Sequence, residues 1–249
     1  MVESLFLIEP AKLAQTSAGA LLTLDGDEGF HAVSVQRMKV GSSLLLADGE
    51  GVVAHCTVES VEGKATLNAR VLALTTTPPP QPRLVVVQAL AKGERGELAV
   101  ELLTEVGVDL IVPWAASRCI VKWDEEKSEK GVKKWRTTAR EASKQARRAT
   151  IPQVTNLAQT SDVCRLISET SHAFILHETG QVKLSSVSIP LQGDVLLVVG
   201  PEGGLTEEEL EQFTQKGGTI ARLGPTILRT STAGTVAAGI VMSRTNRWL

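Results

Sequence analysis

A glycine-rich segment followed at once by carboxylates is the stretch of this chain best suited to chemistry. Residues 199–205 read VGPEGGL, and TEEELEQF comes next. Thr206 and Glu209 have the spacing of a capping box, so a helix should begin directly after the loop. Amides at a helix N-terminus favour anions, but Glu202 and residues 207–209 would oppose a phosphate, and the Walker lysine is absent. The loop therefore predicts a neutral or cationic ligand, with a plain tight turn before a surface helix as the alternative.

A second loop of this kind lies near the C-terminus. ARLGPTILRTSTAGTVAAGIV predicts a strand that ends at Leu223-Gly224, an irregular segment, and a helix capped by Thr230, Ser231 or Thr232. A dinucleotide-binding fingerprint would instead follow the first strand, and AKGERGE after VVVQAL is not GxGxxG. The two late loops therefore indicate an α/β design other than the Rossmann fold.

Alternating strands and helices must position these loops. The runs RLVVVQAL, DLIVPW, HAFILHE, DVLLVVG and TIARLG predict buried strands, and ELAVELLTEVG predicts an amphipathic helix closed by Gly107. This alternation is typical of βαβ units, so we expect an α/β domain with a parallel sheet over residues 84–249. The ligand loops would follow its strands at their carboxyl ends, where open α/β sheets place ligands.

The residues before this domain have a different pattern. SLLLADGEGVVAHCTVESVEGKATLNARVLAL contains short alternating runs separated by Asp48-Gly49 and Glu62-Gly63, which predicts a small β-barrel over residues 1–74. TTTPPPQPR, residues 75–83, is too rich in proline to continue a helix or a central strand. It predicts a linker between two domains.

One predicted helix carries a basic stripe. Within GVKKWRTTAREASKQARRATIP, basic residues recur at intervals of four, four and three, at Arg136, Arg140, Lys144 and Arg147. The other side is traced by Val132, Trp135, Ala139, Ala142 and Ala146. We therefore expect an amphipathic helix that ends before Pro152 and contacts phosphates, although a solvated charged face is the simpler alternative.

Composition excludes several other classes. The net charge is −2, so a nucleic-acid partner requires a local basic patch. The three cysteines are far apart and the four histidines have no ligand spacing, which indicates a reducing compartment and no metal site. MVESLFLIEPAKL lacks the pattern of a signal peptide, and no run is apolar enough to cross a membrane. We expect a cytoplasmic protein.

Several of these segments match one known family in order. VVGPEGGLTEEE and LGPTILRTSTA resemble the paired motifs of the knotted SPOUT-type RNA methyltransferases, and more closely those of the ribosomal RNA small subunit methyltransferase E family. HAVSVQRMKVGSSLLLADGEG is similar to that family's pattern at His31, Arg37, Gly41 and Asp48-Gly49. KGERGELAVELLTEVGVDLIVPWAASRCIVK and KKWRTTAREASKQARRATIP are similar to its middle segments, so the resemblance covers nearly the whole chain.

The resemblance implies a fold, a cofactor and a reaction. It implies a PUA-like barrel, a C-terminal trefoil knot, a homodimer, and S-adenosylmethionine held by the knot loops. The implied reaction is methylation of N3 of one uridine in 16S ribosomal RNA, and the partner is that RNA or the small ribosomal subunit. The candidate cofactor-binding residues lie at the strand ends: His177, Glu178, Gly200, Pro201, Glu202, Gly203, Gly204, Leu223, Gly224, Ile227, Leu228, Thr232 and Ala233.

The candidate RNA-binding residues are mostly basic. Besides the helix they include positions near predicted strand ends and two positions in the first domain. The full set is His31, Arg37, Lys92, Arg95, Arg118, Lys122, Arg136, Arg140, Lys144, Arg147 and Arg148.

The reaction also requires a route for the uridine N3 proton. Arg229 is positioned to stabilise negative charge on the uracil carbonyls, and Glu202 or Glu178 is a candidate proton acceptor. Ser231, Thr226 and Arg147 depart from the family pattern, which makes the target contacts less secure than the reaction class.

Two alternatives to this enzyme stay open. A non-catalytic RNA-binding or ribosome-assembly factor would use the barrel and the basic helix equally well, but would have no use for two ligand loops. A nucleotide-binding enzyme is disfavoured by the missing phosphate lysine. The last helix, TAGTVAAGIVMSRTNRW, is apolar around much of its circumference, so we expect its own sheet or a second subunit to cover it, and we predict a two-fold dimer that uses it.

Overall fold

The structure, a computed structural model, describes residues 3–170 and 172–248 in two compact units. The first comprises Met1–Pro79 and Ser143–Ile151, and the second comprises Pro80–Ala142 and Pro152–Leu249. The segment Ser143–Ile151 therefore packs with the β-rich unit, although it follows the start of the α/β part by many residues. Burial of Leu7 beside Ile151 and the bridge between Gly49 and Thr150 hold it there.

The first unit contains one five-stranded sheet. Its strands are β1 (Ser4–Leu7), β2 (Leu21–Leu24), β3 (Ser43–Ala47), β4 (Val52–Glu62) and β5 (Thr66–Thr76), in the order β1-β3-β4-β5-β2. Three short helical segments accompany it: α1 (Pro10–Ala14), α2 (Gly26–Phe30) and a π-helix, η1 (His31–Val35). The predicted turns occur where the sequence placed them, since Gly49 and Gly63 both have positive φ between successive strands. Asp48 closes the first turn by accepting the N–H groups of Glu50, Gly51 and Val52.

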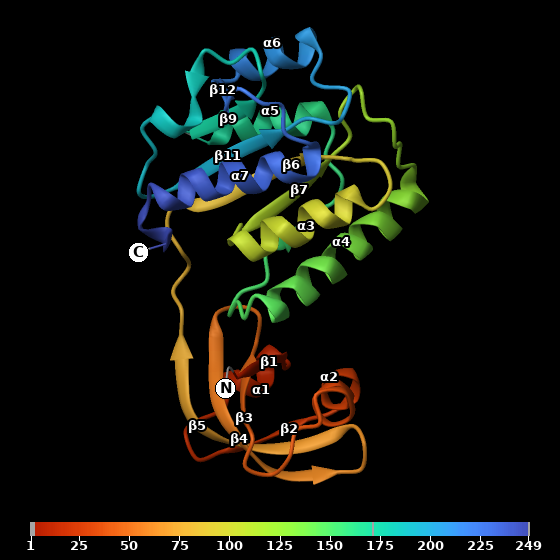
Figure 1. The fold of residues 1–249 in the computed structure, drawn as a ribbon, viewed down its shortest axis with the longest axis vertical. Coiled ribbons are helices and arrows are strands. Elements are labelled where there is room, and N and C mark those ends of the chain that lie inside the picture. The colour runs from red at the N-terminus through yellow and green to blue at the C-terminus, as the bar shows by residue number, and fades with distance from the viewer. Residues whose placement is uncertain (1–2, 171, 249) are drawn as a thin grey trace. The chain divides into compact units, whose positions relative to one another are not determined.

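The second unit is built on a seven-stranded sheet whose pairings are all parallel. The strand order is β10-β12-β9-β11-β6-β7-β8 (Figure 1). The strands are β6 (Arg83–Ala89), β7 (Leu110–Trp114), β8 (Gln153–Val154), β9 (His172–Leu176), β10 (Val182–Lys183), β11 (Asp194–Val199) and β12 (Thr219–Arg222). The five strands expected from the apolar runs are therefore confirmed, as is the parallel α/β class.

Helices cover both faces of this sheet. They are α3 (Arg95–Val106), α4 (Glu125–Gln145), α5 (Thr160–Glu169), α6 (Glu207–Gln215) and α7 (Thr230–Ser243), with short 3-10 turns η2 (Leu184–Ser186) and η3 (Asn246–Trp248). Figure 1 shows α3 and α7 side by side, and their close packing depends on Gly234, where a methyl group would lie 3.2 Å from Leu103 and from Val199. The opposite face packs Phe213 of α6 edge-on against Trp114 of β7. Helices therefore pack on both faces of the sheet, which leaves the strand ends as the expected place for a ligand.

Helix boundaries agree with the sequence at α3 and α6. Gly107 ends α3 with φ 108°, the left-handed conformation that glycine favours. Thr206 and Glu209 form the predicted capping box at the start of α6, with each side chain bonded to the other residue's backbone N–H. These signals are local, which is why the sequence alone sufficed.

The prediction for the start of α7 is wrong. The helix begins at Thr230 with Arg229 as its N-cap, and no side chain caps it. Thr230 and Ser231 are instead buried in the first turn, 6% and 4% exposed. The Thr230 hydroxyl donates to the Gly200 carbonyl oxygen at 2.7 Å, a contact to a distant loop that competes with local capping.

The basic helix α4 ends earlier than its pattern suggested. Its last residue is Gln145, and Arg147 has φ 52°, so the chain leaves the helix in a left-handed conformation. The N–H of Arg148 donates to the Ser143 carbonyl oxygen at 2.9 Å, the kind of bond that closes a helix C-terminus. Ala146, expected on the apolar side, is consequently exposed.

Candidate active site

A small cavity lies at the carboxyl ends of the adjacent strands β9 and β12. Its volume is about 220 Å³. The residues that line it come from the turn after β9, the loop after β12 and the first turns of α7: Leu176, His177, Glu178, Arg222, Leu223, Gly224, Pro225, Thr226, Ile227, Leu228 and Ala233. The cavity is therefore built mainly from two loops that follow neighbouring parallel strands.

Backbone contacts hold the first of these loops in place. The N–H of His177 donates to the Ala221 carbonyl oxygen at 3.0 Å, and the Thr179 hydroxyl lies 2.8 Å from His177 Nδ1. A methyl group added at Gly180 would lie 2.8 Å from the backbone of Ala221 and of Arg222. Only glycine allows the turn to approach β12 this closely.

The lining of the small cavity fits a ligand with an apolar ring and a charged tail. Leucine, isoleucine and alanine side chains supply apolar walls, and the loops supply backbone donors and acceptors. Glu178 is exposed and its carboxylate lies 3.7 Å from His177 Nε2. A negative side chain at the rim suits a cationic group better than a phosphate.

The glycine loop after β11 has a different position. Residues Gly200, Pro201, Glu202, Gly203 and Gly204 are not among those that line the small cavity, and neither is Thr232. Arg118 lies against this loop and donates from Nη1 to the carbonyl oxygens of Gly203 and Leu205, at 3.4 and 3.1 Å. Glu209 is buried and accepts the Ser117 N–H at 2.8 Å. Part of the acidic run therefore supports the fold.

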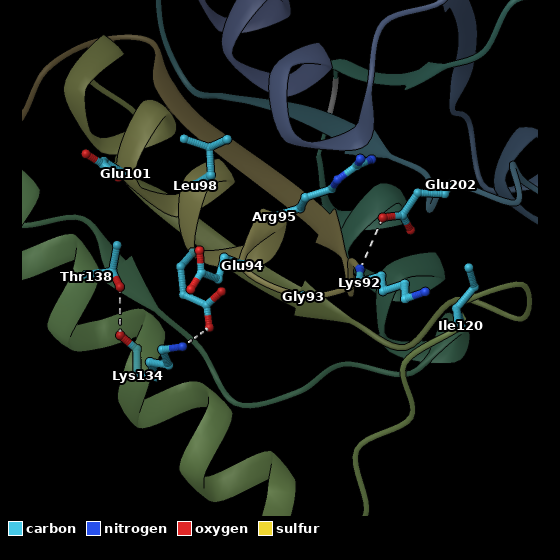
Figure 2. Close-up of a pocket in the computed structure, with 11 residues that line it drawn as sticks. Lys92, Gly93, Glu94, Arg95, Leu98, Glu101, Ile120, Lys134, Thr138 and Glu202 are labelled. Atoms are coloured by element: carbon cyan, nitrogen blue, oxygen red, sulfur yellow. Dashed lines mark hydrogen bonds and ion pairs between the residues drawn. The ribbon is translucent and has the colours of Figure 1, made fainter.

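A larger cavity, about 930 Å³ in volume, contains Glu202. Figure 2 shows it between the start of α3, the side of α4 and the glycine loop. Lys92, Gly93, Glu94, Arg95, Glu97, Leu98, Glu101, Ile120, Lys134, Thr138 and Glu202 line it. The Lys92 backbone N–H donates to Glu202 Oε1 at 3.1 Å, which turns this carboxylate toward the larger cavity (Figure 2).

The charges of the larger cavity are partly paired. Lys134 Nζ lies 2.8 Å from a Glu97 carboxylate oxygen, and this hydrogen bond raises the pKa of Lys134. The side chains of Lys92 and Arg95 make no hydrogen bond or ion pair with any residue that the structure describes. Leu98 and Ile120 are exposed apolar side chains, 42% and 64% exposed. The cavity thus combines the unpaired cations of Lys92 and Arg95 and exposed apolar surface with the carboxylates of Glu94, Glu97, Glu101 and Glu202.

Two of the remaining predicted RNA-binding residues, Arg136 and Lys144, are engaged with other parts of the chain. Arg136 donates to the Val154 carbonyl oxygen at 3.0 Å and to Asn156 at 3.1 Å. Lys144 forms a 3.0 Å ion pair with Glu28, and its side chain is only 11% exposed. Both cations therefore stabilise their own units, which the spacing pattern did not foresee.

The other members of that set differ in their exposure and in their partners. Arg140 and Arg148 also have partners within the chain, Arg148 through Thr150. Arg37, Lys122 and Arg147 are exposed, and Arg37 has φ 56°. His31 packs edge-on against Phe6, with ring centroids 6.0 Å apart.

Arg229 stands at the junction of the second loop and α7. Its side chain is exposed and forms no hydrogen bond or ion pair with the residues described by the structure. The two loops are nevertheless linked one residue later, through the Thr230 hydroxyl and Gly200. The guanidinium is free to meet a substrate.

Sequence reasoning missed part of the site. Leu176, Arg222, Pro225 and Thr226 line the small cavity but were not predicted, although each adjoins a predicted residue. Gly180 carried a detectable signal, a glycine shortly after a strand end. Gln88 also carried a signal, a polar residue within the otherwise apolar run of β6.

Other chemistries find no support in the described part of the chain. Among residues 3–170 and 172–248, no three His, Cys, Asp or Glu side chains are grouped so that they could hold a metal ion. Within the same residues, no helix is long and apolar enough to cross a membrane. Burial raises the pKa of the Cys119 thiol, which does not favour the reactive thiolate.

Comparison with known proteins gives a consistent result. The family model described as an RNA methyltransferase domain matches residues 77–242, and one described as an RNA methyltransferase PUA domain matches residues 24–72. Ribosomal RNA small subunit methyltransferase E of Mycobacterium bovis is 43% identical over 252 residues, covering 100% of this chain and 94% of the relative. The protein of that name from Bacillus subtilis is 30% identical, with 96% of each chain covered.

Solved structures agree. The Neisseria gonorrhoeae enzyme of the same name, bound to S-adenosyl methionine, superimposes with a TM-score of 0.84 at 27% identity, covering 97% of this chain and 98% of that one. A Legionella pneumophila chain in complex with the same cofactor gives a TM-score of 0.85 at 28% identity, covering 98% and 99%. The similarity extends over both units.

Proposed function

This chain belongs to the ribosomal RNA small subunit methyltransferase E family, and we propose from that membership that it methylates N3 of a uridine in 16S ribosomal RNA. The cofactor is S-adenosylmethionine, whose sulfonium supplies an electrophilic methyl group when bound. The observation that carries the proposal is the placement of two different cavities at the carboxyl ends of one parallel sheet. One has the lining of a cofactor site, and the other presents unpaired cations.

The small cavity is the proposed cofactor site. Its apolar walls would enclose the adenine ring, and backbone groups of the loop 223–228 would select it. Glu178 would lie near the positively charged sulfonium of the cofactor. The turn held by Gly180 keeps this wall rigid, so binding does not have to order it.

The larger cavity is the proposed RNA site. Lys92 and Arg95 would contact phosphates, and the exposed side chains of Leu98 and Ile120 would contact ribose or base surfaces. Arg118 and Lys122 would extend this track. In the first unit His31 and Arg37 are the candidate RNA contacts, as the match to the PUA model supports.

The positions of the two candidate proton acceptors support one of them as the base. Uridine N3 must lose its proton as the new bond to carbon forms, and the acceptor must face the RNA. Glu202 lines the larger cavity and Glu178 lines the smaller one, which favours Glu202. We propose that Glu202 accepts the N3 proton and that Glu178 belongs to the cofactor site.

Arg229 is the proposed stabiliser of the uracil anion. Removal of the N3 proton places negative charge on the adjacent carbonyl oxygens, and an unpaired guanidinium has N–H groups that can donate to these oxygens. Arg229→Ala should lower kcat about 100-fold, as for the loss of a transition-state donor. Full turnover by this variant would remove Arg229 from the mechanism.

The proposal is tested by transfer of labelled methyl groups. The protein is incubated with labelled S-adenosylmethionine and small ribosomal subunits from a strain that lacks the gene, and the modified nucleotide is identified by mass spectrometry. We expect 3-methyluridine at one position of 16S ribosomal RNA. Binding of RNA without any transfer would support the rival, a non-catalytic assembly factor.

We also propose a homodimer in the cytoplasm, where small subunits are assembled. Most of α7 is covered by its own domain, but Val236 and Trp248 stay 43% and 55% exposed. These side chains could meet their counterparts in a second copy. Sedimentation as a monomer at micromolar concentration would contradict the dimer.

A further inference from the structure

A buried glutamine lies beneath both ligand loops. Gln88 is on β6, one residue before the strand ends, and is fully buried. A buried primary amide is costly unless its hydrogen bonds are satisfied, and an apolar side chain would fit this otherwise apolar strand without that cost. The amide therefore calls for an explanation in terms of its contacts.

The Gln88 nitrogen is surrounded by acceptors. Nε2 lies 3.0 Å from the Thr230 hydroxyl oxygen, 3.2 Å from the Ala89 carbonyl oxygen and 3.4 Å from the Thr230 carbonyl oxygen. Oε1 has no hydrogen-bond partner among the residues that the structure describes, and points toward Gly234, where a methyl group would lie 3.6 Å away. Exchanging the two atoms would place Oε1 against two carbonyl oxygens, so the orientation of the amide is determined by its neighbours.

This orientation determines the direction of the next hydrogen bond. A hydroxyl group has one proton to donate, and the Thr230 oxygen already accepts from Gln88. The proton of Thr230 is therefore directed to the Gly200 carbonyl oxygen, 2.7 Å away. The result is a one-way chain that runs from Gln88 to Thr230 to Gly200.

The chain ends at both ligand loops. Gly200 is the first residue of the glycine loop that presents Glu202 to the larger cavity. Thr230 directly follows Arg229 and the loop 223–228, which lines the smaller cavity. The glycine loop is tied a second time to the segment after β6, through the Lys92 N–H and Glu202.

We infer that Gln88 is a positioning residue, which holds the two ligand loops in the register that cofactor binding and methyl transfer require. It touches neither ligand and acts through the Thr230 hydroxyl. This inference rests on the proposed function for its consequence in catalysis, but not for its effect on the loops.

Hydrogen exchange tests the inference without any ligand. Gln88→Met keeps an unbranched chain of similar length and removes the donor. Thr230→Val removes the hydroxyl, whereas Thr230→Ser keeps it. In the cofactor-free protein we expect faster amide exchange in residues 200–205 and 223–229 for the Met and Val variants, and exchange like the wild type for the Ser variant. Unchanged exchange in both loops for the Met and Val variants would overturn the inference.

Cofactor affinity gives the second readout. Calorimetric titration with S-adenosylmethionine should show about tenfold weaker binding for Gln88→Met and Thr230→Val, as expected for the loss of one buried hydrogen bond. The double variant should bind S-adenosylmethionine no more weakly than either single variant, because both substitutions interrupt the same series of hydrogen bonds. Additive losses of affinity would mean that the two side chains act separately. That result would contradict the proposed series of hydrogen bonds from Gln88 through Thr230 to Gly200.

A matched control separates positioning from stability. Thr245, just after α7, is also buried, 3% exposed, and among the described residues its hydroxyl bonds only to the Met242 carbonyl oxygen. Thr245→Val should lower the melting temperature without altering cofactor affinity or loop exchange. If Gln88→Met does not fold, the Val and Ser pair at Thr230 still decides the question. A wild-type protein that fails to bind the cofactor would refute the proposed function. The hydrogen-exchange experiment would still test whether Gln88 and Thr230 hold the two loops.

Discussion

The two cavities of the α/β unit differ in what determines their shape. The smaller one is enclosed by loops whose main chains touch, as at Gly180 and Ala221. The larger one is lined by charged side chains of α3, α4 and the glycine loop. Under the proposed assignment of the cofactor to the smaller cavity and of RNA to the larger one, we expect cofactor selectivity to depend on backbone geometry and RNA affinity to depend on charge. Substitutions should therefore separate the two functions.

The sharpest separation is expected at Glu202. Glu202→Gln keeps an oxygen that can accept the Lys92 N–H, so the loop should stay in place, but the amide cannot take a proton. We expect methyl transfer to fall about 100-fold to 1000-fold, as for the loss of a general base, with cofactor affinity unchanged. Single-turnover kinetics and calorimetry measure the two quantities.

A nearby carboxylate provides the control for this prediction. Glu207 is exposed in the first turn of α6 and lines neither cavity. Glu207→Gln should retain full activity. Full activity of Glu202→Gln would show that another group accepts the proton.

The smaller cavity should respond most strongly to a change in its backbone. A methyl group at Gly180 would meet the main chain of Ala221 and Arg222 at 2.8 Å, and neither can move without shifting β12. Gly180→Ala should therefore weaken cofactor binding about tenfold or more, equivalent to about 1.4 kcal/mol or more, while RNA binding persists. Titration with each ligand checks this.

Gly239 is a suitable comparison for Gly180. It lies within α7, and its added methyl group would meet Trp248 at an ordinary 3.4 Å. Gly239→Ala should leave cofactor affinity at the wild-type value. Equal effects at both glycines would show that backbone contact does not govern the smaller cavity.

The larger cavity should respond to charge and salt. Lys92→Ala and Arg95→Ala should each weaken RNA binding several-fold and reduce the slope of log K against log salt by about 0.7, the value for one phosphate contact on a single strand. Cofactor affinity should not change. Binding assays over a range of salt concentrations give the slope, and Lys183→Ala, an exposed lysine of β10, is the control. An unchanged slope of log K against log salt in both variants would show that Lys92 and Arg95 do not contact the phosphates.

The smallest effect is expected outside both cavities, at Arg147. A non-glycine residue with φ 52° pays a conformational cost, so Arg147→Gly should stabilise the protein by about 0.5–1 kcal/mol. Arg147→Ala removes the same charge without relieving the backbone. Thermal unfolding of both variants separates conformation from charge, and equal stability would exclude the conformational explanation.

Local signals in the sequence predicted much of this arrangement. The capping box at Thr206, the glycine that ends α3 and the five apolar strands each depend on a few neighbouring residues. The loops 200–205 and 223–229 were located for the same reason, and their ligand-binding role stays a prediction. The basic stripe was less informative, because spacing cannot show that Lys144 pairs with Glu28 or that Arg136 donates to Val154.

The sequence by itself determined the class of fold, the family and the two loops that follow parallel strands. Only the tertiary structure decided which loop faces which cavity. Glu202 is turned by a contact with Lys92, 110 residues earlier, and Gly200 is tied through Thr230 to Gln88, which precedes Thr230 by 142 positions. Hydrogen bonds over such separations form only after the sheet has brought its strand ends together, so no local pattern encodes them.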